Sequence, residues 1–235
     1  MARVSISEMD GCLGSNYYHR LGCTLRSACL ETNPVTTALA GITKEGLIAF
    51  EERVKQAFLD KQIHAPVHLS GGNEEQLIEI FKDVRDKDWV FSTWRSHYHA
   101  LLKGIPEEEL FKEILAGRSM YLNNARHKFV CSSIVGGILP IACGVALGAK
   151  LKGLDEKIWV FVGDMTARTG IYHEFVEYCR GFDLPVSVVI EDNHLSTNTP
   201  TSEAWGLQHA QIPIHRYKYE RQYPHVGVGT FVAFG

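Results

Sequence analysis

Two short apolar runs, each followed at once by polar residues, constrain the fold of this chain most. Residues 158–162 (Ile-Trp-Val-Phe-Val) lead into Gly163-Asp164, and residues 186–190 (Val-Ser-Val-Val-Ile) lead into Glu191-Asp192-Asn193. Short runs rich in β-branched and aromatic residues that end in polar turns are typical of buried parallel strands. We therefore predict a strand at each run.

The segment between the two runs predicts how these strands are connected. Ile171, Phe175, Val176 and Cys179 recur at the spacing of one helical face, and Leu184-Pro185 marks the return of the chain. A strand–helix–strand crossover places its two strands side by side, about 5 Å apart. The pattern predicts an α/β fold, built on an open, mostly parallel sheet with helices on both faces.

Asp164 and Asn193 are expected to emerge together at the carboxyl edge of this sheet, where open α/β folds bind ligands. A carboxylate and an amide oxygen suit a hard cation such as Mg²⁺. Taken singly, each residue has another explanation, because Asp often caps a helix and Asn often forms a turn.

Composition and charge narrow the class of protein. The 235 residues, 45% of them hydrophobic, are enough for one sizeable core. A net charge of −3 and a pI near 6.4 favour neither nucleic acid nor an anionic membrane as a partner. No apolar run approaches the roughly 20 residues that span a bilayer, and no basic-to-apolar leader opens the sequence.

The cysteines and the helix signals predict the organisation of the chain. The cysteines form no CxxC pair, which favours free thiols and a cytoplasmic location; they are Cys12, Cys23, Cys29, Cys131, Cys143 and Cys179. We expect residues 1–40 to form an irregular N-terminal arm and residues 41–235 to form one α/β domain. Thr43, Asn73 and Pro106 are expected to begin helices. The Gly- and Ala-rich residues 134–151 predict a buried helix that another subunit approaches closely.

Four segments at matching spacing resemble a known family. Gly163, Asp164 and Met165, followed by Glu191-Asp192-Asn193, resemble the thiamine-diphosphate motif that opens with Gly-Asp-Gly and closes with Asn-Asn. Residues 68–75, 90–104 and 133–140 are similar to the α subunit of the decarboxylating component of 2-oxoacid dehydrogenases, acetoin dehydrogenase included. The resemblance covers about Leu47 to Thr201 and implies the diphosphate-binding domain of the transketolase-like superfamily.

The resemblance implies a magnesium site and a diphosphate site. Asp164, Asn193 and the carbonyl of Leu195 would bind Mg²⁺. Arg95 would pair with the diphosphate, since a guanidinium fork suits phosphate oxygens. Other implied diphosphate contacts are Trp94, where the family commonly has tyrosine, and the backbone of Gly163, Met165 and Thr166.

The remaining implied contacts lie toward the reacting end of the cofactor. Ser133 and Val135 would hold the aminopyrimidine through main-chain atoms, and His97 or His99 would face the reacting end. His225, in a glycine-rich segment, either reaches the cofactor or belongs to an exit loop. Singly, His97 and His99 also suit structural histidines, and Ser133 suits a helix cap.

The implied function is that of an α-type subunit that decarboxylates a 2-oxo acid, or cleaves a related ketone, and passes the acyl unit to an acceptor. A β-type subunit would supply the pyrimidine domain and the activating glutamate in an α2β2 assembly. Met165 and Asp192 depart from the family motif. The alternatives are a split transketolase-like enzyme, a non-oxidative decarboxylase or carboligase, and a non-catalytic scaffold.

Overall fold

The computed structural model describes residues 41–205 and 215–233. The arm expected over residues 1–40, with Cys12, Cys23 and Cys29, lies outside the described residues. Cys131, Cys143 and Cys179 are free thiols. No helix in the described ranges combines the length and apolar character that a membrane crossing requires.

A six-stranded sheet forms the centre of the described residues, and every neighbouring pair except one is parallel. In spatial order its strands are β2 (Asn123–Asn124), β3 (Phe129–Cys131), β1 (Trp89–Ser92), β4 (Ile158–Gly163), β5 (Val186–Asp192) and β8 (Arg216–Lys218). The exception is the β2–β3 pair, which is antiparallel. The predicted open, mostly parallel sheet is confirmed.

The predicted crossover is also confirmed. β4 runs through the short 3-10 helix η4 (Thr166–Arg168) and α6 (Gly170–Gly181) into β5, and the two strands pair in parallel with Gly163 opposite Glu191. The predicted helical face is right at Phe175 and Cys179 but wrong at Ile171, because Tyr172 is buried in its place. Ile171 is 38% exposed.

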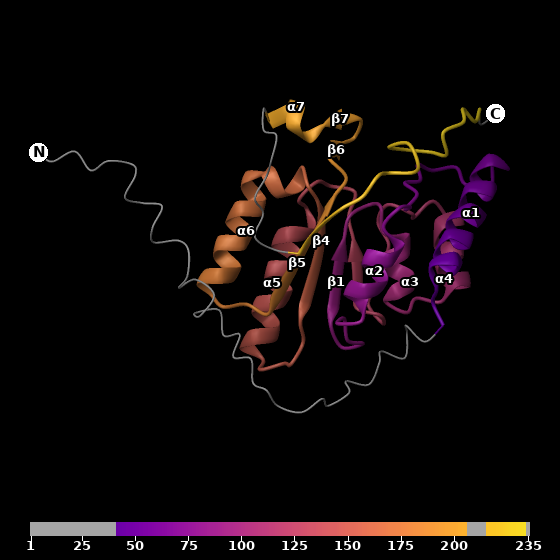
Figure 1. The fold of residues 1–235 in the computed structure, drawn as a ribbon. Coiled ribbons are helices and arrows are strands. Elements are labelled where there is room, and N and C mark those ends of the chain that lie inside the picture. The colour runs from indigo at the N-terminus through magenta and orange to yellow at the C-terminus, as the bar shows by residue number, and fades with distance from the viewer. Residues whose placement is uncertain (1–40, 206–214, 234–235) are drawn as a thin grey trace, which may run out of the picture. The chain divides into compact units, whose positions relative to one another are not determined.

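Helices cover both faces of the sheet, and the strand alternation separates two cores (Figure 1). Trp159 and Phe161 of β4 join one core with α1 (Lys44–Leu59), α2 (Glu74–Phe81), α3 (His97–Leu102) and α4 (Glu107–Leu115). Val160 and Val162 face the other core, with α5 (Ile138–Leu151) and α6. Successive side chains of a strand point to opposite faces, so one apolar run supplies both cores.

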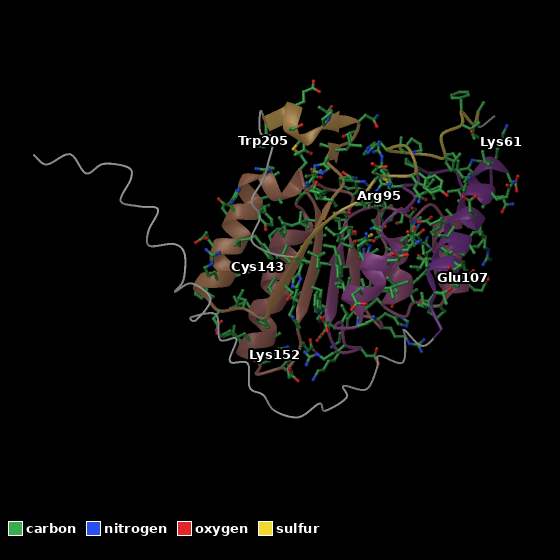
Figure 2. The ribbon with its side chains drawn as sticks, in the orientation of Figure 1. Lys61, Arg95, Glu107, Cys143, Lys152 and Trp205 are labelled. Atoms are coloured by element: carbon green, nitrogen blue, oxygen red, sulfur yellow. The ribbon has the colours of Figure 1, made fainter. Side chains whose placement is uncertain are left out.

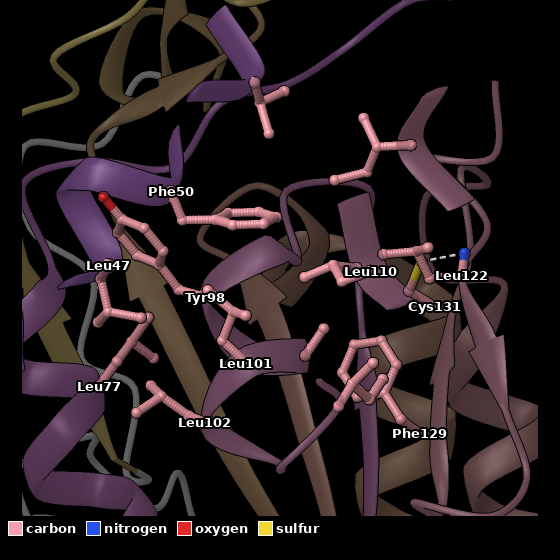
Figure 3. Close-up of a cluster of buried hydrophobic side chains, with 14 of the residues drawn as sticks. Leu47, Phe50, Leu77, Tyr98, Leu101, Leu102, Leu110, Leu122, Phe129 and Cys131 are labelled. Atoms are coloured by element: carbon pink, nitrogen blue, oxygen red, sulfur yellow. Dashed lines mark hydrogen bonds between the residues drawn. The ribbon is translucent and has the colours of Figure 1, made fainter. Parts of the chain in front are cut away.

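Figure 3 shows part of the first core, in which Phe50 of α1, Leu77 of α2, Tyr98 of α3 and Leu110 of α4 are buried. Behind them, the Cys131 thiol accepts a hydrogen bond from the backbone N–H of Leu122 at 3.0 Å. Burial raises the pKa of this thiol to about 11. Cys131 therefore serves packing in the structure.

The three helix starts lie where the sequence predicts them. The Thr43 hydroxyl accepts a hydrogen bond from the N–H of Gly46 at 3.2 Å and caps α1. Asn73 precedes α2 without capping it, since its amide donates instead to Glu191 and Tyr217. Pro106 precedes α4.

The helix predicted over residues 134–151 is shorter and less buried than expected. α5 begins at Ile138, and its buried residues lie along one face. Ile141 and Leu151, on the other side, are 51% and 77% exposed. The prediction of a fully buried helix is therefore wrong for the single chain. The described residues cover only the face of α5 that lies against the sheet.

A small hairpin and a short helix follow β5. The hairpin consists of β6 (Leu195–Ser196) and β7 (Thr199–Pro200), and α7 (Thr201–Trp205) comes directly after it. Figure 1 shows these elements beyond the ends of β4 and β5, together with the C-terminal segment in yellow. They frame the candidate site.

Candidate functional site

A cavity of about 120 Å³ opens at the carboxyl ends of β1, β4 and β5. Its lining residues come from these strand ends, from the β6–β7 hairpin and from the C-terminal segment: Thr93, Trp94, Arg95, Val135, Gly163, Asp164, Met165, Thr166, Glu191, Asn193, Leu195, Ser196, Thr197, Tyr219, Arg221 and His225. Figure 2 shows Arg95 toward this end of the sheet. Residues distant in sequence thus line one cavity, and these lining residues are called its wall below.

Asp164 is a buried carboxylate on this wall, with 3% of its surface exposed. It accepts a hydrogen bond from the Thr201 hydroxyl. Burial raises the pKa of Asp164, the Thr201 bond opposes the rise, and the nearby charge of Asp192 adds to it. A cation beside Asp164 would stabilise its ionised form.

Asn193 lies on the same wall, held by two hydrogen bonds. Its side-chain oxygen accepts from the N–H of Leu195 at 3.0 Å, and its amide nitrogen donates to the Tyr219 hydroxyl at 3.2 Å. An amide oxygen has two lone pairs, so one remains for a cation. Asp192 does not line the cavity; it is fully buried and accepts from the N–H of His194 at 2.9 Å.

Glu191 is a second carboxylate on the wall, and other side chains surround it. Tyr217 donates to it at 2.5 Å and the Asn73 amide at 3.2 Å. Both of these bonds reach Oε1 of Glu191. His99 Nε2 lies 3.2 Å from the same Oε1, within ion-pair distance but poorly aligned for a hydrogen bond. Burial alone would raise the pKa of Glu191, but His99 and Tyr217 outweigh it and lower that pKa.

Arg95 and His225 also line the cavity, and His68 lies beside His225. The Arg95 guanidinium donates to the carbonyl oxygen of Leu69. The ring of His68 lies 5.0 Å from that of His225 and 5.9 Å from that of Trp94, measured between centroids. Burial, and then the charge of Arg95, lower the pKa of His68 to about 3.

His225 lines the cavity, as the sequence allowed. Burial, followed by the charges of Arg95 and Arg221, lowers its pKa. The ring is therefore neutral near pH 7 and has one donor and one acceptor nitrogen. A neutral imidazole can exchange a proton with a bound ligand.

One of the two departures from the family motif, Met165, fits the local backbone. Met165 has φ −69° and ψ −38°, ordinary values for any residue, so glycine is not required here. Its sulfur accepts a hydrogen bond from the Trp205 indole at 2.8 Å. A Cβ at Gly163 would meet no atom within 4 Å.

His97 and His99 lie away from the cavity. Both are on α3 rather than on a strand or loop, with 0% and 1% of their surface exposed. His97 contacts both oxygens of Glu51, at 3.0 and 3.1 Å, and the Ser119 hydroxyl at 2.8 Å. Their catalytic roles stay predictions, and their contacts are with other buried side chains.

Val135 lines the cavity and is 52% exposed, whereas the exposed Ser133 does not line it. Ser133 also caps no helix, since α5 begins only at Ile138. Ser132 forms the local turn instead, by accepting from the N–H of Ile134 at 3.1 Å.

Four polar residues of this region were not predicted from the sequence: His68, Glu191, Tyr219 and Arg221. Glu191 belongs to the second part of the family motif, and the alternation along β5 was a usable signal for it. Tyr219 and Arg221 follow β8 and carry no motif. Their position depends on the pairing of β8 with β5.

The donor set of the cavity suits a cation bound to an anionic ligand. No group of three or more His, Cys, Asp or Glu side chains within the described ranges could hold a metal by itself. A cation would therefore rely on Asp164 and Asn193 together with a carbonyl, water or ligand oxygens, which is usual for Mg²⁺.

A family model described as the dehydrogenase E1 component matches residues 44–210. The α subunit of acetoin:2,6-dichlorophenolindophenol oxidoreductase from Cupriavidus necator is 32% identical over 160 residues, which cover 64% of this chain and 48% of that protein. The same subunit from Bacillus subtilis is 30% identical over 161 residues, covering 64% and 48%.

A pyruvate dehydrogenase relative is also similar. The E1 component subunit α from Porphyra purpurea is 28% identical over 192 residues, covering 69% of this chain and 56% of that protein. The chain spans about half the length of the curated relatives it matches.

Proposed function

The chain belongs to the family of dehydrogenase E1 components, and from this premise we propose that it is the α-type subunit of a two-chain thiamine-diphosphate enzyme. Its reaction would be the decarboxylation of a 2-oxo acid, or the cleavage of a related ketone, with transfer of the acyl unit to an acceptor. One observation carries the proposal: a carboxylate–amide pair and a guanidinium line the same cavity at the carboxyl edge of a parallel sheet.

The residues present fit a magnesium-bound diphosphate. Asp164, Asn193 and the carbonyl of Leu195 would hold Mg²⁺, which prefers such oxygen ligands. Arg95 would pair with the diphosphate through its guanidinium fork. When bound, thiamine diphosphate supplies the carbanion and the electron sink of the reaction.

The backbone and the remaining wall would orient the ligand. Gly163, Met165 and Thr166 line the cavity where η4 begins, and their main-chain groups would approach the diphosphate. Trp94 and Val135 supply apolar surface to the same wall, which limits access of water. His225 is the histidine of this wall, and we propose it for proton exchange with the ligand in preference to the buried His97 and His99.

A β-type partner, in an α2β2 assembly, completes the proposal. The relatives that match this chain are named as α subunits, which supports a partner of a second type. That partner would supply the pyrimidine domain and the activating glutamate. The free thiols of Cys131, Cys143 and Cys179 support a reducing compartment, and we propose the cytoplasm.

Cofactor binding tests the proposal directly. Calorimetric titration with thiamine diphosphate and Mg²⁺, on the chain together with its co-purified partner, should show saturable binding that chelation of the metal abolishes. The same complex should then consume a 2-oxo acid. A complex that binds no cofactor would point to the scaffold alternative, and turnover of a ketol donor alone would point to the transketolase-like one.

A further inference from the structure

Two guanidinium groups share the wall of the cavity. Arg95 donates to a backbone carbonyl, that of Leu69. Arg221 donates to the carbonyl of Thr197 at 2.7 Å and to the side-chain oxygen of Asn198 at 3.1 Å. Within residues 41–205 and 215–233, no ion pair of 4.0 Å or less joins either arginine to a carboxylate, although the charge of Arg95 contributes to the lowered pKa of Glu191. Two positive charges therefore face one small space.

The acidic residues of the wall are occupied by other donors. Glu191 accepts from Tyr217 and Asn73, and Asp164 accepts from Thr201. Burial, and then the charge of Arg95, lowers the pKa of Arg221, as expected for like charges held near one another. A bound polyanion would offset this repulsion.

Arg221 also holds the β6–β7 hairpin. Thr197, whose carbonyl it binds, has φ +58°, a left-handed conformation that is unfavourable for a β-branched residue. Leu195, Ser196 and Thr197 of this hairpin line the cavity. A guanidinium has five N–H donors, so the two bonds to the hairpin leave others for a ligand.

We propose that Arg221 is a second anion-binding residue of the cavity, which grips a diphosphate together with Arg95 while it holds the β6–β7 hairpin in place. This inference rests on the proposed function, since it assigns a further residue to the same site. The ligand class is a diphosphate group, whose charge and oxygen spacing suit two guanidinium forks. Binding and hairpin order are then coupled through one side chain.

Titration with inorganic pyrophosphate tests the assignment without the metal. The full-length chain, with any partner that co-purifies, is titrated in chelator by calorimetry. Arg221→Gln should weaken pyrophosphate binding roughly tenfold or more, as expected for lost hydrogen bonds between charged groups. Arg221→Lys should recover part of the loss. Arg126→Gln, at an exposed arginine outside the cavity, is the matched control and should bind like the wild type.

Hydrogen exchange gives a second readout that a folding defect would not imitate. Saturating pyrophosphate should slow amide exchange at residues 195–198 in the wild type and in Arg95→Gln, but not in Arg221→Gln. If Arg221→Gln does not fold, Arg221→Lys replaces it in both measurements, with severalfold weaker binding expected. Pyrophosphate affinity within twofold of the wild type in the folded Arg221 variant would overturn the inference.

A further titration with thiamine diphosphate and Mg²⁺ distinguishes a failure of the Arg221 assignment from a failure of the proposed function. Arg221-dependent pyrophosphate binding without any additional affinity for thiamine diphosphate supports the inference and removes the proposed function. Tight thiamine diphosphate binding that depends on Asp164 but not on Arg221 supports the proposed function and overturns the role of Arg221. A wild-type chain that does not bind pyrophosphate removes the anion site altogether.

Discussion

Asp164 is the residue on which a cation site in this cavity depends most. Its carboxylate is buried, its pKa is raised by that burial, and the Thr201 hydroxyl donates a hydrogen bond to it. Burying a carboxylate without a nearby positive charge is unfavourable, which supports the proposed cation at this position. Asn193 supplies the neutral oxygen beside it.

We predict that Asp164→Ala abolishes Mg²⁺-dependent binding of thiamine diphosphate while the fold survives. The variant removes the anionic oxygen that a hard cation requires, but it removes no apolar side chain from either core. Calorimetry measures the binding, and circular dichroism checks the fold. Asp155→Ala, at an aspartate whose side chain is 78% exposed, is the control. Unchanged cofactor affinity in Asp164→Ala would rule out the metal assignment.

His68 should make stability sensitive to acid. Its folded pKa of about 3 lies below the usual 6.5, so the folded chain binds fewer protons than the unfolded chain between these values. The contribution of the neutral His68 ring to the free energy of unfolding is fully present above pH 6.5 and is lost as the pH falls toward 3. Among the residues that the structure describes, no side chain or backbone group forms a hydrogen bond with its Nδ1, so none would stabilise a charged ring.

We predict that the free energy of unfolding falls by about 3 kcal/mol more in the wild type than in His68→Gln when the pH is lowered from about 7 to about 4. Urea unfolding at the two pH values measures this difference. His64→Gln, at an exposed histidine, is the control. An equal acid loss in the wild type and in His68→Gln would show that His68 is not the titrating group.

At the scale of elements, α5 presents an apolar face that no described residue covers. Ile141 and Leu151 are exposed, Gly144 is exposed between them, and Gly148 is partly buried. A Cβ at Gly144 or Gly148 would meet no atom within 4 Å. The small residues thus leave room for a neighbour outside the chain, and the subunit contact predicted from the sequence stays a prediction.

We predict that Gly144→Leu weakens association with another subunit without lowering the stability of the monomer. Leucine favours a helix over glycine by about 0.8 kcal/mol, and the site has space for it. Analytical ultracentrifugation measures association, and thermal unfolding measures stability. Gly181→Leu, in the last position of α6, is the matched control. Normal assembly of Gly144→Leu, or a destabilised monomer, would count against the interface.

At the scale of the whole molecule, the described residues place one set of diphosphate-binding candidates at the carboxyl ends of β1, β4 and β5. The proposed activating glutamate belongs to a partner. Loss of a positioned general acid or base typically costs about 10²–10⁴ in rate. The chain alone should therefore lack the catalysed reaction even when the diphosphate is bound.

We predict no 2-oxo acid consumption by the chain purified free of its partner, and restored turnover when a β-type subunit is added. Steady-state consumption of the 2-oxo acid is the measurement. Asp164→Ala, combined with the same partner, is the control for background decarboxylation. Robust turnover by the chain alone would mean that it carries its own activating acid, and the two-chain proposal would then fail.

The central part of the fold and the strand-end residues of the cavity could be predicted from the amino-acid sequence. β4, α6 and β5 follow from local periodicity, because buried strands and amphipathic helices have patterns that short segments reveal. Asp164 and Asn193 follow strands that pair in parallel, so their shared edge could be predicted before any packing was known. The Thr43 cap is likewise a local signal.

Which other side chains reach the cavity depends on how the elements pack, and no local pattern predicts it. His97 and His99 lie on α3 and are buried against neighbouring elements. There His97 contacts Glu51, and His99 contacts Glu191. Arg221 reaches the wall because β8 pairs with β5, a contact between segments far apart in sequence. Periodicity describes a segment's own faces, whereas the environment of a side chain depends on the elements that pack against it.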